Sequence, residues 1–173
     1  MGENEQHSLM SSFRERLIEH LFIGQLLTIS WLFDNAQLEV ARPEVDSQGY
    51  DIVLENQGVI RHVQIKSSKL GARTREQNVH VALANKPSGC VIWVYFDELT
   101  LSLGPYYVFG DDAGKPLPPI EHLPVARHTK GDAQGVKHER PRIRRVKRSL
   151  FHKVEEASGV YEWLFGLQLQ KEK

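Results

Sequence analysis

Cysteine is nearly absent from this sequence, which limits how the chain can be held together. The 173 residues include one cysteine, Cys90. No disulfide can therefore form within the chain, and no cysteine–histidine zinc set can be assembled. Such a chain suits a reducing compartment, so we expect a cytoplasmic protein.

Long hydrophobic runs are also missing. The longest early apolar stretch, residues 21–33, is interrupted by Gln25, Thr28 and Ser30 and follows a charged segment. It is too short and too polar to span a bilayer, and it lacks the features of a signal peptide. No membrane partner is expected.

The chain has no excess of either charge, with 22 Lys and Arg against 22 Asp and Glu. The charges are nevertheless separated along the sequence. Residues 1–60 hold three Arg against ten acids, a net charge of −7, and residues 121–153 hold ten Lys and Arg against three acids, a net charge of +7. A basic segment of this kind can contact phosphate groups.

Hydrophobic patterning predicts a single α/β domain over residues 1–173. With 40% hydrophobic residues, the chain is long enough for one domain with its own core. Strands are predicted near residues 38–41, 90–96 and 106–109, and a closing helix over 154–169. Residues 73–83 fit either a strand or a short helix. A long helix is predicted from about Phe13 to Asp34, with a core stripe formed by Leu17, Leu21, Ile23, Leu26, Leu27, Trp31 and Leu32.

Two strands predicted around the turn Asn56-Gln57-Gly58 carry the most informative polar residues. Asp51 opens the first strand, residues 49–55, while Gln64 and Lys66 lie on the return strand, residues 59–66. Because side chains alternate along a strand, Gln64 and Lys66 face the same side, and pairing brings them close to Asp51. Mg²⁺ accepts carboxylate and amide oxygens, and a nearby lysine can orient or deprotonate a bound water beside a phosphate. An acid that enters a buried strand needs such a cation, which favours a site over a solvated edge residue.

This arrangement resembles the PD-(D/E)xK, or restriction-endonuclease-like, nuclease superfamily in a Gln-x-Lys variant. The resemblance covers roughly residues 11–96, in which a helix precedes a hairpin carrying Asp51 and then Gln64-Ile65-Lys66. It implies a restriction-endonuclease-like core with a mixed central β-sheet flanked by helices, and a further helix before the next strand. The nuclease-like core would span about residues 11–109, followed by a basic extension over about 110–173. The Pro-Asp dipeptide of the superfamily is absent, and Asp46 is either a turn residue or a second acid near the metal.

The resemblance also implies a reaction, the Mg²⁺-dependent hydrolysis of phosphodiester bonds in nucleic acid. DNA is the expected substrate, and Mn²⁺ is an alternative metal. Asp51 and Gln64 would be the metal ligands, with help from the carbonyl of Ile65. Lys66 would orient the attacking water and stabilise charge on the phosphate.

A carboxylate on the first helix is a further feature of the superfamily. It commonly occurs as Gly-Glu at the position of Gly24-Gln25 here, where this sequence has the amide instead. Glu19 is the other candidate. Six residues apart, Glu19 and Gln25 differ by about 240° around a helix, so both cannot face the site.

The basic segment is predicted to form a strand that contacts phosphate groups. By alternation, Arg142 and Arg144 fall on one face and Ile143 on the other. A merely solvated charged strand is the alternative. The candidate nucleic-acid-binding residues are Arg140, Arg142, Arg144, Arg145, Lys147 and Arg148.

Two functions therefore stay open at this point. The first is a metal-dependent nuclease. The second is a catalytically weak or inactive nuclease-like module that binds nucleic acid or a partner protein, which Gln25 and the single certain carboxylate, Asp51, support. A homodimer is compatible with either function.

Overall fold

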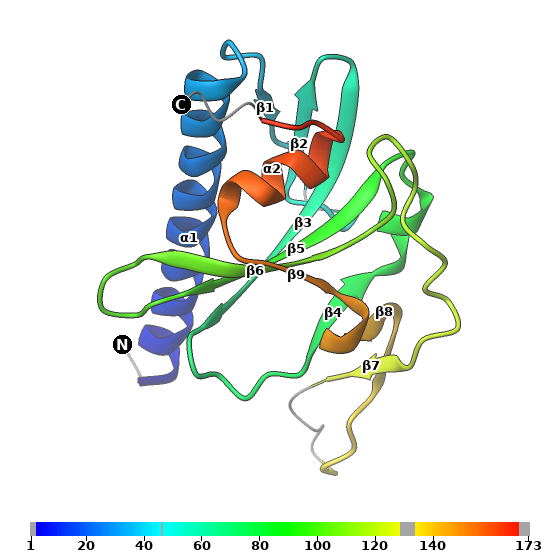
Figure 1. Cartoon of the computed structure of the whole chain (residues 1–173). Coiled ribbons are helices and arrows are strands. Elements are labelled where there is room, and N and C mark those ends of the chain that lie inside the picture. Colours follow the sequence, from blue (N-terminus) through cyan, green and yellow to red (C-terminus); the bar gives the residue numbers. More distant parts are fainter. Residues whose placement is uncertain (1–2, 46, 129–133, 170–173) are drawn as a thin grey trace.

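The fold begins with a long helix along one side of the molecule (Figure 1). The computed structural model describes residues 3–45, 47–128 and 134–169. Helix α1 spans Glu3–Phe33, and helix α2 spans Ala157–Phe165. Among the helices of these residues, none is long and apolar enough to cross a membrane. The strands are β1 (Glu39–Ala41), β2 (Ile52–Asn56), β3 (Val59–Lys69), β4 (Glu76–His80), β5 (Gly89–Phe96), β6 (Leu103–Phe109), β7 (Val125–Arg127), β8 (Glu139–Lys147) and β9 (His152–Val154), with 3-10 turns η1 (Val81–Asn85) and η2 (Arg148–Leu150).

The strands of the described residues form two sheets. The central sheet has six strands in the order β1-β2-β3-β5-β6-β9, in which β3 and β5 are parallel and the other neighbours are antiparallel. The second sheet has the order β4-β8-β7 and is antiparallel. The predicted α/β class with a mixed central sheet is confirmed.

Both helices cover the same face of the central sheet. Phe22 of α1 and Leu164 of α2 pack in one cluster with Ile92 of β5. On the opposite face, Val146 of the second sheet packs in another cluster with Trp93 of β5. Strand β5 is buried along its whole length because it contributes to both clusters, as its continuous apolar sequence predicts. Helices therefore flank one face of the sheet, and the second sheet covers the other.

The predicted hairpin is confirmed. Strands β2 and β3 are antiparallel, with Ile52 opposite Val63 and Asn56 opposite Val59. The turn residues Gln57 and Gly58 have φ values of 51° and 86°. Positive φ at both central residues is typical of the two-residue turns that match the twist of paired strands.

The connection from β3 to the parallel strand β5 differs from the further helix that we expected. It contains strand β4 and the 3-10 turn η1. Strand β4 pairs with β8, placing Val79 opposite Arg144. The hydrogen-bond partners of β4 lie in β8, more than 60 residues later in the sequence. The residues of the segment itself therefore could not show that it forms a strand.

The rotation of α1 differs from the predicted stripe. The helix buries Ile18, Phe22 and Leu26 completely, whereas Leu27 and Trp31 are 45% and 75% exposed. The prediction was wrong for these two residues and for Leu32, which is also exposed. Apolar residues occupy two sides of this helix, and only packing against the sheet decides which side is buried.

A buried polar network fixes the end of α1 to the hairpin and to α2. The Asp34 carboxylate accepts hydrogen bonds from Tyr161 Oη at 2.7 Å, Asn56 Nδ2 at 2.5 Å and Gln57 Nε2 at 2.9 Å. Hydrogen bonds to a charged acceptor are stronger than neutral ones. The network therefore orients the hairpin relative to α1, and this orientation positions the site described next.

Candidate active site

A polar cavity of about 550 Å³ lies at the edge of the central sheet, where β3 continues beyond the start of β2. Three predicted site residues, Glu19, Asp51 and Lys66, line this cavity. The lining comes from α1, from the residue before β2, from β3 and from β4. It comprises Ser12, Glu15, Arg16, Glu19, Asp51, Ile65, Lys66, Ser67, Gln77 and Asn78.

Asp51 is held against the edge of β3 by two hydrogen bonds. Its amide donates to the Val63 carbonyl at 2.9 Å, which continues the hairpin ladder. Its Oδ2 accepts the Ile65 amide at 2.6 Å. Beyond the start of β2, the carboxylate thus takes the place of a strand partner. Because the amide and carbonyl of one strand residue point to the same side, the Ile65 carbonyl also faces this edge.

Gln64 and Lys66 lie on one face of β3, as predicted. They pair with Val91 and Trp93 of β5, whose side chains belong to the cluster under the second sheet. Lys66 lines the cavity, whereas Gln64 is 9% exposed and is not one of the lining residues. Gln64 Oε1 has no hydrogen-bond partner among the described residues. A buried acceptor in this state costs about 1–3 kcal/mol, which a cation or an ordered water would relieve.

Of the two helix positions considered from the sequence, Glu19 lines the cavity and Gln25 does not. The Glu19 side chain is buried and forms ion pairs with two arginines, Arg16 at 3.1 Å and Arg42. Gln25 instead accepts a hydrogen bond from the Tyr106 hydroxyl of β6 at 2.6 Å. The position where the superfamily commonly has a glutamate, Gln25, therefore does not face this cavity. The rotation of α1 turns both Glu15 and Glu19 to the cavity, and Glu19 is the buried one of the two.

Arg16 and Arg42 are residues of the site that sequence patterning did not indicate. Both line a neighbouring hollow of about 370 Å³, together with Asp51. The spacing of Arg16 and Glu19, three residues apart on a helix, is a weak signal for the first pair. Nothing local indicates Arg42, which reaches Glu19 only because β1 pairs with β2. The two guanidinium groups place positive charge beside Asp51.

His62 lies on the same face of β3 as Gln64, two residues earlier in the strand. Its ring contacts Tyr50 edge-on, with ring centroids 5.0 Å apart. Burial lowers the pKa of His62 below its usual value, and the nearby Lys86 ammonium lowers it further. The imidazole is therefore neutral at pH 7.

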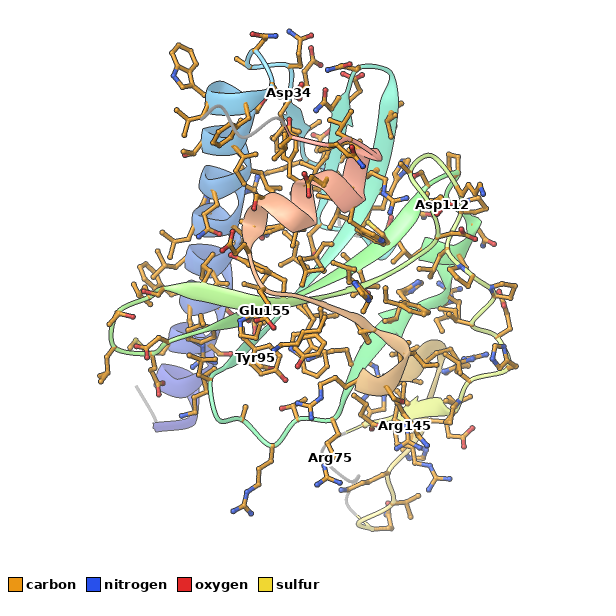
Figure 2. All side chains as sticks on the ribbon, viewed as in Figure 1. Asp34, Arg75, Tyr95, Asp112, Arg145 and Glu155 are labelled. Atoms are coloured by element: carbon orange, nitrogen blue, oxygen red, sulfur yellow. The ribbon has the colours of Figure 1, made fainter. Side chains whose placement is uncertain are left out.

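Strand β8 confirms the strand predicted for the basic segment, but several of its basic residues are engaged in the fold. Arg144 donates to the carbonyls of Glu121 at 3.1 Å and of Pro141 at 2.7 Å. Arg145, labelled beside the second sheet in Figure 2, pairs with Glu76 of β4 at 3.2 Å. These contacts join β8 to its neighbours.

The other basic residues of this segment differ in their surroundings. The Arg148 guanidinium lies over the ring of Tyr107, 5.8 Å from its centroid. The remaining three are exposed and make no side-chain hydrogen bond or ion pair within the part of the chain that the structure describes; they are Arg140, Arg142 and Lys147. These three keep their charges available for an external partner.

The second sheet adjoins the cavity. Gln77 and Asn78 of β4 form one wall of the cavity, and Asn78 also lines a hollow of about 630 Å³ on the second sheet. That hollow includes Arg127, Lys137 and Arg145. The candidate active site and the basic sheet therefore meet at β4.

The acidic content of the site is low. No cluster of three or more His, Cys, Asp or Glu side chains suited to a metal ion occurs within residues 3–45, 47–128 and 134–169. Asp46, the second acid considered from the sequence, lies outside the described residues. The carboxylates that line the cavity are those of Glu15, Glu19 and Asp51, and the Ile65 carbonyl faces the same edge. The Gln64 amide lies on the same strand face as Lys66 but is buried outside the lining.

Comparisons with known proteins add little to this description. No protein-family model and no curated protein matches the chain. Among solved structures, the chain is similar to a bacterial homing endonuclease, I-Ssp6803I, with 22% identity and a TM-score of 0.34. The similarity covers 55% of this chain and 61% of that chain, so this chain spans less than two thirds of that protein's length.

Proposed function

We propose that this protein is a metal-dependent nuclease of the PD-(D/E)xK type that hydrolyses phosphodiester bonds in nucleic acid, with DNA as the expected substrate. The observation that carries the proposal is the convergence of Glu19, Asp51 and Lys66 on one polar cavity. They come from a helix, a strand entry and a neighbouring strand. A cavity lined by three carboxylates, those of Glu15, Glu19 and Asp51, with an ammonium group and flanking arginines, suits a phosphate substrate and a divalent cation.

The donor set fits Mg²⁺ or Mn²⁺ bound with few protein ligands. Mg²⁺ is usually held by one or two carboxylates, and waters and substrate phosphates complete its shell. Asp51 and Gln64 would hold the ion, and the unpartnered Oε1 of Gln64 is the observation that supports this assignment. A bound divalent cation would lower the pKa of a water and offset charge on the phosphate.

In this proposal, other side chains around the cavity orient the attacking water and bind the phosphate. Lys66 donates a hydrogen bond to the attacking water or to a phosphate oxygen, so its charge stabilises the transition state. Arg16 and Arg42 bind the phosphate backbone on either side of Asp51. A phosphate bound there would compete with Glu19 for the two guanidinium groups, and the Glu19 carboxylate would then be able to hold a cation.

A second candidate is a nuclease-like module that binds nucleic acid without cleaving it. The observation that favours it is the pairing of Glu19 with two arginines. With its charge offset in this way, Glu19 contributes little to a cation, and Asp51 stays as the main carboxylate. In this case the arginines and the basic residues of β8 would bind phosphate, and the cavity would have no catalytic role.

Cleavage assays on matched variants distinguish the two candidates. Purified protein is incubated with duplex DNA, single-stranded DNA and RNA, with Mg²⁺, Mn²⁺ or chelator. For a nuclease, Asp51→Asn should abolish metal binding and cleavage. Lys66→Met should lower the cleavage rate by roughly 100-fold or more and leave metal binding intact. The control is Lys69→Met on the same strand, because Lys69 lies outside the cavity and forms an exposed ion pair with Glu98.

Equal activity of the Lys66→Met and Lys69→Met variants would contradict the catalytic assignment. If the wild-type protein cleaves none of the three substrates with either metal but binds them, the binding module is the correct function. Loss of binding in an Arg16→Ala/Arg42→Ala variant would then place the nucleic acid at this cavity.

A further inference from the structure

The outer side of α1 carries a row of exposed apolar side chains. Figure 1 shows α1 at one side of the molecule, with α2 and most of the sheet to its right and the turn between β5 and β6 extending past it. On the other side, Met10, Phe13, Leu27 and Trp31 are 66%, 71%, 45% and 75% exposed. Large apolar side chains scattered singly are ordinary on a protein surface, whereas several on one side of one helix, here Met10 with Phe13 and Leu27 with Trp31, mark an interaction surface.

These residues follow a heptad repeat. Positions 10, 13, 17, 20, 24, 27 and 31 alternate steps of three and four residues, and they are Met10, Phe13, Leu17, His20, Gly24, Leu27 and Trp31. This spacing keeps one narrow seam facing a partner helix, whereas a helix that lies on a sheet or a lipid surface has a wider apolar face. We call these seven residues the α1 seam. The sheet-facing residues of α1, such as Phe22 and Leu26, lie on the other side of the helix.

Gly24 in the middle of the seam is a second, independent observation. A glycine within a helix costs roughly 0.5–1 kcal/mol relative to alanine. A Cβ added at Gly24 would meet no atom within 4 Å, so nothing in the described part of the chain requires a glycine there. Close approach of another helix backbone is a physical reason for a residue without a side chain.

We propose that the α1 seam pairs with the same seam of a second copy of this chain, with the two helices antiparallel. Charge favours the antiparallel arrangement. Arg14 flanks the amino-terminal half of the seam without an ion pair among the described residues, whereas the charge of Arg16 is offset by Glu19 and the uncharged Thr28 flanks the other half. Parallel helices would gather the arginines of both copies at one end, whereas antiparallel helices separate them.

Size and shape are also compatible with this partner. In an antiparallel pair, heptad packing places Phe13 beside Trp31 of the second copy, Leu17 beside its Leu27, and His20 beside its Gly24. The seam is roughly 32 Å long. Its four most exposed apolar side chains offer roughly 500 Å². With flanking polar groups, the area approaches the ~800 Å² per partner of a specific interface.

The test is the mass of the full-length protein in solution, by light scattering and sedimentation over a ~100-fold concentration range. A dimer of the 19.8 kDa chain has a mass of about 40 kDa. The Leu27→Glu/Trp31→Glu variant should be monomeric, because two charges enter the seam. The control is Leu99→Glu, because Leu99 is 94% exposed outside the seam; this variant should dimerise like the wild type.

Two further variants keep the proposal testable if the charged variant does not fold. Gly24→Leu fits the single chain, which has open space there, and should retain the helical signal while weakening the dimer at least tenfold. The Phe13→Cys/Trp31→Cys variant should form disulfides between position 13 of one copy and position 31 of the other after oxidation. Links joining 13 to 13 and 31 to 31 would overturn the antiparallel arrangement.

A wild-type protein that is monomeric throughout the concentration range would overturn the proposal. So would Leu27→Glu/Trp31→Glu or Gly24→Leu variants that fold and dimerise as the wild type does. A monomer that floats with phosphatidylglycerol vesicles would assign the α1 seam to a lipid surface instead.

Discussion

Replacing the buried amide of Gln64 with a carboxylate tests whether a divalent cation belongs at this edge of the sheet. Gln64 is 9% exposed, and its Oε1 lacks a hydrogen-bond partner among the described residues. In Gln64→Glu, the new carboxylate enters the same position with a full negative charge. Without a cation, burial of that charge should cost at least the penalty of an unsatisfied buried group, about 1–3 kcal/mol.

The expected change in thermal stability follows from this magnitude. In a chain of this size, 1 kcal/mol corresponds to about 2–4 °C in Tm. Metal-free Gln64→Glu should therefore melt about 2–12 °C below the wild type. A cation that binds the folded state at 100 times its Kd adds about 2.7 kcal/mol, which offsets most of the loss. Mg²⁺ should thus raise the Tm of the variant more than that of the wild type, and cleavage should increase.

The loss of stability in Gln64→Glu should depend on pH, because the new carboxylate is desolvated in the folded state. Burial disfavours the charged form, so the folded-state pKa of this group is raised above the usual value of about 4.3 for Glu. The destabilisation is then fully present above the folded-state pKa and disappears as the pH falls below the unfolded value. The Tm difference between metal-free variant and wild type should therefore narrow towards pH 4.

Gln25→Glu is the matched control, since it makes the same chemical change on the opposite face of the sheet. Burial raises the pKa of Tyr106 to about 12. The Tyr106 hydroxyl therefore stays protonated and donates equally well to a carboxylate at position 25. The control should show no Mg²⁺-dependent change in Tm beyond that of the wild type. A Gln64→Glu variant whose Tm is indifferent to Mg²⁺ and Mn²⁺, or a control with the same response, would refute the metal assignment.

Three other predictions concern the basic strand, His62 and Arg61. The Arg142→Ala/Lys147→Ala variant should bind nucleic acid more weakly, and the magnitude of the slope of log K against log salt concentration should fall by about 0.9 for each lost phosphate contact. The Arg144→Ala variant should chiefly have a lower Tm, because Arg144 donates hydrogen bonds to backbone carbonyls. The pKa of His62 is lowered in the folded state, so the free energy of unfolding should fall as the pH drops below the pKa of about 6.5 in the unfolded chain. In urea unfolding between pH 7 and 5, the His62→Gln variant should lose less stability than the wild type. Arg61 is fully buried and bonds three oxygens of Ser88, Asp111 and Asp112, so Arg61→Met should lower the free energy of unfolding by about 2–4 kcal/mol, and a variant as stable as the wild type would contradict this account.

Local sequence was sufficient for the features that depend on neighbouring residues. The Asn56-Gln57-Gly58 turn and the alternation after it predicted the hairpin, and a hairpin by itself brings Asp51 near Lys66. The apolar run at 90–96 predicted a strand buried on both faces, and the structure confirms it. Alternation in the basic segment predicted β8. In each case, a dihedral preference or a side-chain period acts over a few residues, so the information is contained in the segment itself.

Tertiary structure decided everything that depends on contacts between distant segments. Glu19 and Gln25 are equally plausible on a helix, and only the burial of Ile18, Phe22 and Leu26 turns Glu19 to the cavity. The pairing of β1 with β2 brings Arg42 to Glu19, and the pairing of β4 with β8 supplies the far wall of the site. The helix also has a second apolar side, and its period does not show which side faces the core. Helix rotation and strand pairing are selected by the total packing of the chain, to which any single segment contributes only a part.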